Sequence, residues 1–338
     1  MDQFRASVTE MLDFMRCRRM WNYVSKNRMH LQPVVGPNAL STGVFIHRVL
    51  ELQVTMPSSD AIVQAISEAW EDYLAKYQSA VGTQPAEAEI DLFSKSLITA
   101  QQIVQNYFRC YGENTLEQIQ MRYEVAESDW ELEIAPNVVL TGKFDGVLTN
   151  DHGHIWLIDH KTYSGSAPDV DQMHNDFQFN VYVWAARQLF GRCEGLVYDG
   201  ILKSVPSKPK LNSDGKSMSR QLIKTTRELY LEALLDAGLD PEPYQAHLEK
   251  LPTWNDTFKR VVLQLNPNTK VWASIVAGII GDMQRAILYP NLRWEGCWDC
   301  SFKALCNMEQ HGLSPTDAYM IHSGSYIQLR PKSKEVTL

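Results

Sequence analysis

The stretch "HIWLIDHKTY" (154–163) ends an apolar run with Asp159, His160 and Lys161. An apolar run of this length is typical of a strand buried in a sheet. Residues i and i+2 of a strand point to the same face, so Asp159 and Lys161 share a face while His160 points the other way. Charges at the end of a buried strand are costly unless they bind something. This position favours a chemical role over a surface ion pair.

A second carboxylate, Asp145, lies between two glycines in "TGKFDGV". If its strand pairs with the strand of Asp159 through the turn "NDHG", the two carboxylates meet at one end of a hairpin. Two close carboxylates repel each other unless a cation neutralises them. Oxygen ligands suit Mg²⁺ or Mn²⁺, which also bind substrate phosphate. Lys161 could then orient or deprotonate an attacking water, or stabilise charge developing on phosphorus.

Each of these residues also has an ordinary interpretation. Asp145 could serve a turn, and Asp159 with Lys161 could form a surface ion pair of little value. An isolated Asp-x-Lys recurs by chance. Further motifs in a fixed order are therefore needed to separate a site from coincidence.

Such motifs are present. "GKFDGV" and "LIDHKT", with thirteen residues between Asp145 and Asp159, resemble the signature of the PD-(D/E)XK nuclease superfamily, above all its RecB-like branch. Upstream, "GVFIHRVLE" is similar to the helical Gly-x-x-x-His motif of that branch and offers His47. Downstream, "FQFNVYVWA" is similar to its Gln-x-x-x-Tyr motif, with Gln178 and Tyr182. Alone, each suits helix packing; their order makes the nuclease interpretation the stronger one.

The resemblance implies a fold and a set of roles. The fold is mixed α/β, a restriction-endonuclease-like core with a largely antiparallel central sheet flanked by helices. The ligands of Mg²⁺ or Mn²⁺ would be His47, Asp145, Asp159 and the main-chain carbonyl of His160. Lys161 would serve the attacking water and the transition state, while Gln178 and Tyr182 would position the nucleic-acid strand or the lysine. His174 and Glu124 are further candidates that we leave unassigned.

Cysteines form a second motif. Cys297, Cys300 and Cys306 give C-x₂-C-x₅-C, flanked by Trp294 and Trp298. A closed site needs a fourth thiolate, from Cys17, Cys110 or Cys193. By chemistry alone four thiolates could bind Zn²⁺. "RCRRMWNY", with Cys17, resembles the N-terminal cysteine segment of RecB-like nucleases that carry an iron–sulfur cluster. That resemblance implies a structural 4Fe–4S cluster on Cys17, Cys297, Cys300 and Cys306, with zinc as the alternative.

The charge of the chain is unevenly distributed. The formal net charge is −8, but residues 16–28 hold five basic side chains and no acidic one, and residues 203–227 hold seven against Asp214. This pattern suits a protein that binds a polyanion at a restricted place, and two solvated basic faces would explain it equally well. We expect a cytoplasmic protein without a membrane span, because we find no secretory signal and the apolar window 271–280 is short.

The elements that position these residues follow from periodicity. Helical patterns dominate the first 115 residues, at 39–54 with Ser41 or Thr42 as N-cap, at 59–81 and at 88–111. Short strands are expected at 119–127, 130–135, 138–149 and 154–163, followed by a helix at 171–190 and a strand at 194–205. Beyond a mobile loop at 206–220, we expect helices to about 250, a strand at 258–265 and a helix at 268–288.

These patterns suggest four parts. Residues 1–115 form a helical region that contributes Cys17 and His47, and residues 116–205 form the nuclease core. Residues 206–250 form a basic loop and helical insertion, which we expect to help grip a strand of nucleic acid. Residues 251–338 form a C-terminal helical region with the cysteines.

The function expected from the sequence is a metal-dependent DNA exonuclease acting on single-stranded ends in recombination, repair or phage DNA processing. The phosphate-binding loop of ATP-driven motors is missing from the sequence, so unwinding would need a helicase or recombination partner. Two alternatives stay open: a non-catalytic nucleic-acid-binding subunit with a structural iron–sulfur or zinc site, and a zinc-stapled regulatory protein. The sequence leaves the oligomeric state open.

Overall fold

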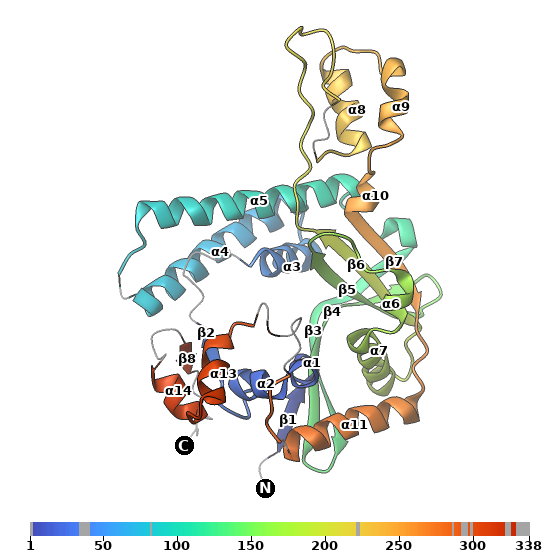
Figure 1. Ribbon diagram of the computed structural model, residues 1–338. Helices are drawn as coiled ribbons and strands as arrows, with labels where there is room; N and C mark the ends of the chain where they lie inside the picture. Colours follow the sequence, from blue (N-terminus) through green and yellow to red (C-terminus); the bar gives the residue numbers. More distant parts are fainter. Residues whose placement is uncertain are drawn as a thin grey trace.

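The computed structural model describes residues 3–33, 41–81, 83–220, 224–285, 287–291, 297, 300–321 and 326–328. Its centre is a six-stranded sheet (Figure 1) of β1 (Phe4–Ser7), β3 (Met121–Ala135), β4 (Val138–Asn150), β5 (Ile155–Tyr163), β6 (Gly195–Leu202) and β7 (Phe258–Gln264). The order is β1-β4-β5-β6-β7, and β3 also pairs with β4. The pairs β3–β4, β4–β5 and β6–β7 are antiparallel, while β1–β4 and β5–β6 are parallel. The expected mixed α/β fold with a largely antiparallel sheet is confirmed.

Helices cover both faces of this sheet (Figure 1). On one side lie α3 (Thr42–Gln53), α4 (Ser58–Val81) and α5 (Glu87–Tyr111), packed through a core that includes Phe45, Ile103 and Phe258. On the other lie α1 (Val8–Arg16), α7 (Phe177–Phe190) and α11 (Thr269–Arg285), packed through Phe14, Phe179 and Ile280. The apolar stripes of these helices therefore bury the sheet in a three-layer arrangement.

Three local features differ from the expected pattern. The segments 119–127 and 130–135 form one strand, β3, because Ser128 and Asp129 keep pairing with Phe144 and Lys143. The short strand β1 lies inside the region expected to be helical. The helix expected at 171–190 is divided into α6 (Val170–His174) and α7, whose N-cap Asp176 accepts from Phe179 N.

Strand β4 has three neighbours. Along one edge it pairs with β3 throughout, and along the other it pairs with β1 over residues 138–141 and with β5 over residues 146–149. The ladder between β4 and β5 stops at Gly146 and Ile158, while β5 continues beside β6. The two strands therefore separate at the residues next to this last pair, Asp145 on β4 and Asp159 on β5. We call this place the fork.

The remaining elements form two smaller units. Near the cysteines lie α2 (Arg18–Val24), β2 (Leu31–Pro33), α13 (Lys303–Gln310), α14 (Pro315–Ile321) and β8 (Tyr326–Gln328), with β2 and β8 paired. The insertion contains α8 (Arg227–Asp236), η2 (Glu242–Tyr244) and α9 (Gln245–Leu248), followed by α10 (Trp254–Thr257). Helices α8 and α9 lie away from the sheet (Figure 1) around their own apolar cluster, which includes Tyr230 and Leu234.

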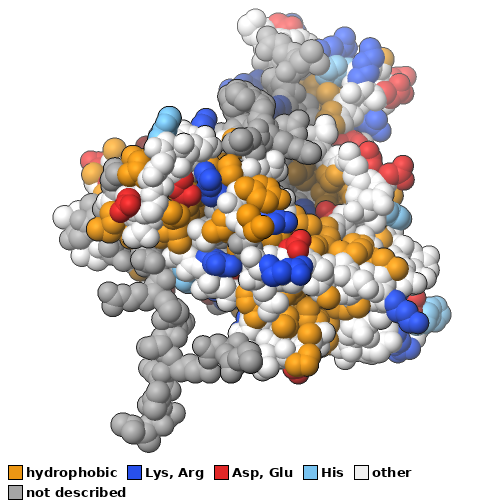
Figure 2. Space-filling view, turned by 60° about the horizontal axis from the view of Figure 1, so that its bottom comes forward, with side chains coloured by type: hydrophobic (Ala, Val, Ile, Leu, Met, Phe, Trp, Pro, Cys, Tyr) orange, Lys and Arg blue, Asp and Glu red, His pale blue; other side chains and the backbone are white. Residues whose placement is uncertain are grey.

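Several basic side chains of the two windows have internal partners. Arg18 lies 3.5 Å from a carboxylate oxygen of Asp282, and Arg19 lies 3.4 Å from Glu309. Lys208 in the insertion pairs with two acidic residues of α8. On the face that carries α11, Lys and Arg side chains stand in separate small groups between hydrophobic ones (Figure 2). Part of the charge seen in the sequence therefore serves packing, and the gripping role of the insertion stays a prediction.

Among the residues that the structure describes, no helix combines the length and apolarity needed to cross a bilayer.

The tightest backbone approach in the sheet gives a stability prediction. A Cβ at Gly195 would lie 2.0 Å from the main-chain oxygen of Leu263, in the neighbouring strand β7. Gly195→Ala should therefore lower the free energy of unfolding by about 1–3 kcal/mol. As a control, a Cβ at Gly278 in α11 would meet nothing within 4 Å. Gly278→Ala should raise it by about 0.5–1 kcal/mol. Urea unfolding of both variants measures this, and equal stabilities would contradict it.

Candidate functional site

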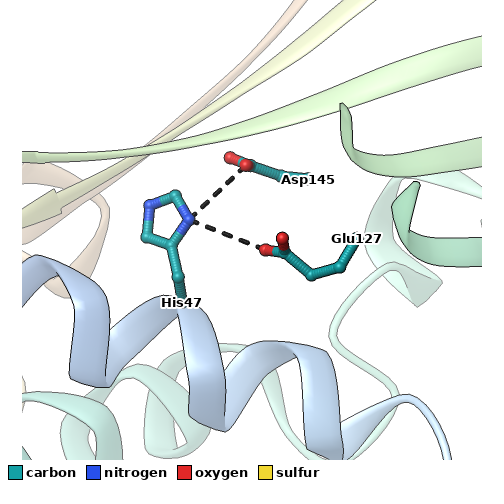
Figure 3. Close-up of side chains that lie close together, drawn as sticks. All are labelled: His47, Glu127 and Asp145. Carbon is teal, nitrogen blue, oxygen red and sulfur yellow. Dashed lines mark ion pairs between the residues drawn. The ribbon is translucent and has the colours of Figure 1, made fainter. Parts of the chain in front are cut away.

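Three side chains from three elements meet at the fork (Figure 3). His47 comes from α3, Glu127 from β3 and Asp145 from β4. His47 Nδ1 lies 3.5 Å from Asp145 Oδ1 and 3.9 Å from Glu127 Oε1. One ligand atom from each residue lies within 4.8 Å of the other two, so the group could hold a metal ion.

Helix α3 reaches the fork because of its first turn. Its N-cap Ser41 accepts from Val44 N, which confirms one of the two expected caps. A Cβ at Gly43 would lie 3.1 Å from Thr162 Oγ1 of β5, so glycine lets the helix approach the strand closely. His47 follows one turn later on the same side of the helix. The Gly-x-x-x-His spacing is thus a packing requirement that aims an imidazole at the sheet.

Glu127 was not found by sequence reasoning. Tyr123 pairs with Leu148 but Val125 pairs with Val147, so Glu124 is an extra residue in β3. This bulge moves the register by one and leaves Glu127 opposite Asp145. Glu127 also has a φ of 51°, a left-handed conformation that costs a non-glycine residue about 1–3 kcal/mol. Such strain often marks a functional site.

A second group adjoins the first. Lys161 Nζ lies 2.8 Å from Asp159 Oδ2, and it donates to Asp159 Oδ1 at 3.1 Å and to Gln178 Oε1 at 3.1 Å. Gln178 Nε2 donates to Tyr182 Oη at 3.0 Å. Two predicted motifs, one on β5 and one on α7, are therefore joined by a single chain of polar contacts that ends at the lysine.

The remaining sequence candidates lie as follows. The main-chain N–H of His160 donates to Asp145 Oδ2 at 2.7 Å, across the fork. Glu124 accepts from Thr149 Oγ1, and His174 is exposed on α6, so the structure joins neither to the two groups above. Asp159 lies outside the three-residue group because its carboxylate faces Lys161.

Burial and charge shift the proton affinities at the fork. Burial alone would lower the pKa of His47, but the hydrogen bond and charge of Asp145 outweigh it and raise that pKa. The same contact lowers the pKa of Asp145, against the effect of its burial. Burial and the charge of Asp145 raise the pKa of Asp159 to about 6, although Lys161 opposes them. A cation would thus compete with a proton on Asp159 in mildly acidic solution.

The donor set fits a hard divalent cation. Asp159 is 2 % exposed, and Lys161 Nζ lies 2.8 Å from its Oδ2, but burial and the charge of Asp145 outweigh this contact and raise its pKa. Two buried carboxylates that a lysine neutralises only in part are stabilised further by a bound cation. Carboxylate oxygens and one imidazole suit Mg²⁺ or Mn²⁺. The residues present therefore fit the metal that the motifs imply.

A cleft of about 740 Å³ opens beside this site. Lys143 and Tyr182 line it, and Trp130 on β3 contributes to its wall. Arg5 and Lys26 from the N-terminal segment line it as well. Four acidic side chains line it too: Glu10, Asp13, Asp129 and Glu131.

The four predicted cysteines line one cavity of about 200 Å³. Cys17 follows α1, while Cys300 and Cys306 belong to the segment around α13. Asn291 links two of them, since its N–H donates to Cys17 Sγ at 3.3 Å and its carbonyl lies 3.4 Å from Cys297 Sγ. Trp294 and Trp298 lie outside the described residues. Cys110 lies on α5, and Cys193 is buried in the core beside the sheet.

A mixed sheet that opens at a fork defines an α/β protein in which a group of one histidine and two carboxylates could bind a metal ion beside a lysine. The chain belongs to the PD-(D/E)XK nuclease superfamily, whose family description matches residues 5–307. No curated protein matches the sequence.

Two solved structures are similar to parts of this chain. SSO0001 is 14% identical, over 89% of this chain and 96% of that chain, with a TM-score of 0.31. A protein from Eubacterium rectale described as a candidate exonuclease is 14% identical, over 78% of this chain and 86% of that chain, with a TM-score of 0.32.

The position of Glu127 gives a prediction about metal binding. Glu127→Gln removes one charge from the three-residue group, so Mn²⁺ affinity should fall by about tenfold or more. Glu124→Gln, three residues earlier on the same strand, should leave it unchanged because Glu124 faces Thr149. Isothermal titration of the intact variants with Mn²⁺ measures both. Equal affinities would remove Glu127 from the site.

Proposed function

We propose that this chain is a Mg²⁺- or Mn²⁺-dependent DNA exonuclease of the RecB-like branch, acting on single-stranded ends. The observation that carries the proposal is the placement of Lys161, held between Asp159 and Gln178 beside the group of His47, Glu127 and Asp145. This arrangement puts a fixed positive charge next to a set of metal ligands, and both can stabilise the charge that develops during phosphodiester hydrolysis.

In this proposal the side chains at the fork divide the work. His47, Asp145 and Asp159, with Glu127 and the main-chain carbonyl of His160, would hold the cation. When bound, the cation would neutralise charge on the scissile phosphate and make water more acidic. Burial alone would lower the pKa of Lys161, but Asp159 raises it overall. Lys161 therefore stays protonated at neutral pH and stabilises the charge that builds on phosphorus.

Gln178 and Tyr182 would keep Lys161 in place. Burial raises the pKa of Tyr182 to about 12, so its phenol stays neutral. Its oxygen accepts from Gln178 Nε2, which turns Gln178 Oε1 toward Lys161. A side chain aimed in this way loses little entropy when substrate arrives.

The preference for a single strand follows from the resemblance of the motifs to RecB-like nucleases. The cleft touches the lysine network only at Tyr182, and Arg5 and Lys143 in its lining are paired with Glu131 and Glu127. We also propose a role in recombination, repair or phage DNA processing with a helicase or recombination partner. A cytoplasmic location is supported by six cysteines, none of them in a disulfide.

The first prediction of this proposal concerns Lys161. With Mg²⁺ or Mn²⁺ the wild type should shorten end-labelled single-stranded DNA, faster than duplex DNA. Lys161→Ala should reduce the rate by about 10²–10³-fold, because it removes charge stabilisation in the transition state. Lys95→Ala is the control, since Lys95 is exposed on α5 and pairs only with Asp91 in the described residues. Undiminished cleavage by Lys161→Ala would refute the mechanism. DNA binding without any cleavage by the wild type would favour the non-catalytic alternative.

We further propose that the cysteine cavity holds a structural 4Fe–4S cluster. The four cysteines line one cavity, which four thiolates need for binding either zinc or a cluster. The choice of a cluster follows from the resemblance of the segment "RCRRMWNY", with Cys17, to that of RecB-like nucleases that carry one.

The second prediction tests the metal of this cavity. Protein purified without oxygen should contain iron and acid-labile sulfide and absorb visible light. Cys300→Ala should lose the iron and lower the unfolding temperature, because the cavity then lacks one ligand. Cys110→Ala is the matched control, since Cys110 lies on α5 outside the cavity. Zinc without iron would refute the cluster, as would a Cys17→Ala protein with unchanged colour and stability.

A further inference from the structure

A network of buried polar side chains in the central sheet adjoins the fork. Asp199 of β6 is fully buried and accepts three hydrogen bonds. Arg260 Nε donates to its Oδ1 at 2.8 Å, while Tyr107 Oη lies 2.7 Å from its Oδ2. His160 Nδ1 also lies 2.7 Å from Oδ2. A buried carboxylate with this many partners has only one favourable arrangement.

The ring of His160 is held in this network by contacts on both of its nitrogens. The negative charge of Asp199 is already matched by Arg260, whose side chain is 6% exposed. The two ring nitrogens have separate partners: Nδ1 lies 2.7 Å from Asp199 Oδ2, and Nε2 lies 3.2 Å from Tyr123 Oη. Both ring nitrogens then have a partner, and the ring orientation is fixed.

The main chain of the same residue reaches the opposite side of the fork. β5 lies against β6 with His160 beside Asp199, so the side-chain contact follows the register of the ladder. The N–H of His160 lacks a carbonyl partner on β4, because the ladder ends at Gly146 and Ile158. It donates instead to Asp145 Oδ2, at 2.7 Å. Asp145 Oδ1 is then directed to His47.

We propose that His160 is a positioning residue: its imidazole, held by Asp199 and Arg260, fixes the peptide N–H that orients Asp145 in the candidate cation site. The role depends on the proposed function for its effect on cleavage, but it acts on the cation site itself. Four neighbouring strands carry the link, from Arg260 on β7 through Asp199 and His160 to Asp145. The middle residue of Asp-His-Lys thus points to the face opposite Asp159 and Lys161 and still contacts the candidate cation site.

A second observation agrees with this link. The rings of His47 and His160 are 5.8 Å apart and nearly perpendicular. The same residue therefore packs against one candidate ligand and hydrogen-bonds another. A change in its side chain would disturb the two ligands together.

The test compares three substitutions by titrating the intact chain with Mn²⁺ alone. His160→Leu removes both ring contacts and should weaken Mn²⁺ binding by about 10–100-fold, as loss of a hydrogen-bond partner behind a metal ligand typically does. His160→Asn should restore most of the affinity, because its amide can donate to Asp199 from the place of Nδ1. His152→Leu, an exposed histidine in the turn before β5, should bind as the wild type does.

Further readouts separate positioning from simple loss of stability. Urea unfolding reports stability, and DNA affinity without metal should be unchanged in all three variants. In cleavage assays, His160→Leu should need more Mn²⁺ for half-maximal rate. A folded His160→Leu protein with the Mn²⁺ affinity of the wild type would overturn the proposal, even if its stability were lower.

If His160→Leu does not fold, Tyr123→Phe decides, because it removes only the hydroxyl that lies 3.2 Å from Nε2. Weakened Mn²⁺ binding by this variant supports the proposal, and unchanged binding overturns it. A wild type that binds Mn²⁺ but cuts no DNA would refute the proposed function and leave the positioning role to be judged by the titrations. A wild type that binds no Mn²⁺ would refute both.

Discussion

The separation of β4 from β5 is the constraint on which the rest of the site depends. Backbone groups inside a sheet must be paired, so strands can part only where something else accepts their hydrogen bonds. Here a carboxylate takes the place of a carbonyl: Asp145 accepts the N–H of His160 where the ladder has ended. β5 stays in the sheet because β6 holds its other edge. The gap thus opened is where α3 and β3 add their side chains.

The charges at the fork are arranged so that the chain can fold around them. Each carboxylate has a basic neighbour: Asp145 has His47, Asp159 has Lys161, and Glu127 has Lys143. Isolated buried carboxylates would instead take up protons or destabilise the fold. Pairing keeps the carboxylates close enough for a cation to bridge them. The raised pKa of Asp159 shows that the compensation there is incomplete, because burial outweighs Lys161.

The sequence predicted the position of a site residue where its chemical type and a rule of backbone geometry agreed. The alternation of side chains along a strand placed Asp159 and Lys161 together, and the Ser41 cap placed the start of the helix that carries His47. Glu127 could not be found in this way, because β3 contains five acidic residues and the bulge at Glu124 decides which one faces Asp145. Strand β1 was missed for a related reason: four residues are too few for a periodic pattern, and only pairing with β4 makes them a strand.

Strand β4 connects the fork with the region of the cysteine cavity. β4 pairs with β1 at its start and carries Asp145 near its other end. β1 leads directly into α1, and Cys17 caps that helix at its C-terminus, so the sheet sets where the cysteine cavity begins. On the far side, Phe302 stacks on Tyr23 of α2 at 5.3 Å between ring centroids and brings α13 with Cys306 to the same cavity. Because the segments that carry these cysteines lie far apart in sequence, ligation would stabilise the fold that holds β1 against β4. The effect of ligation on the fork would pass through the pairing of β1 with β4 rather than through contact with the metal ligands.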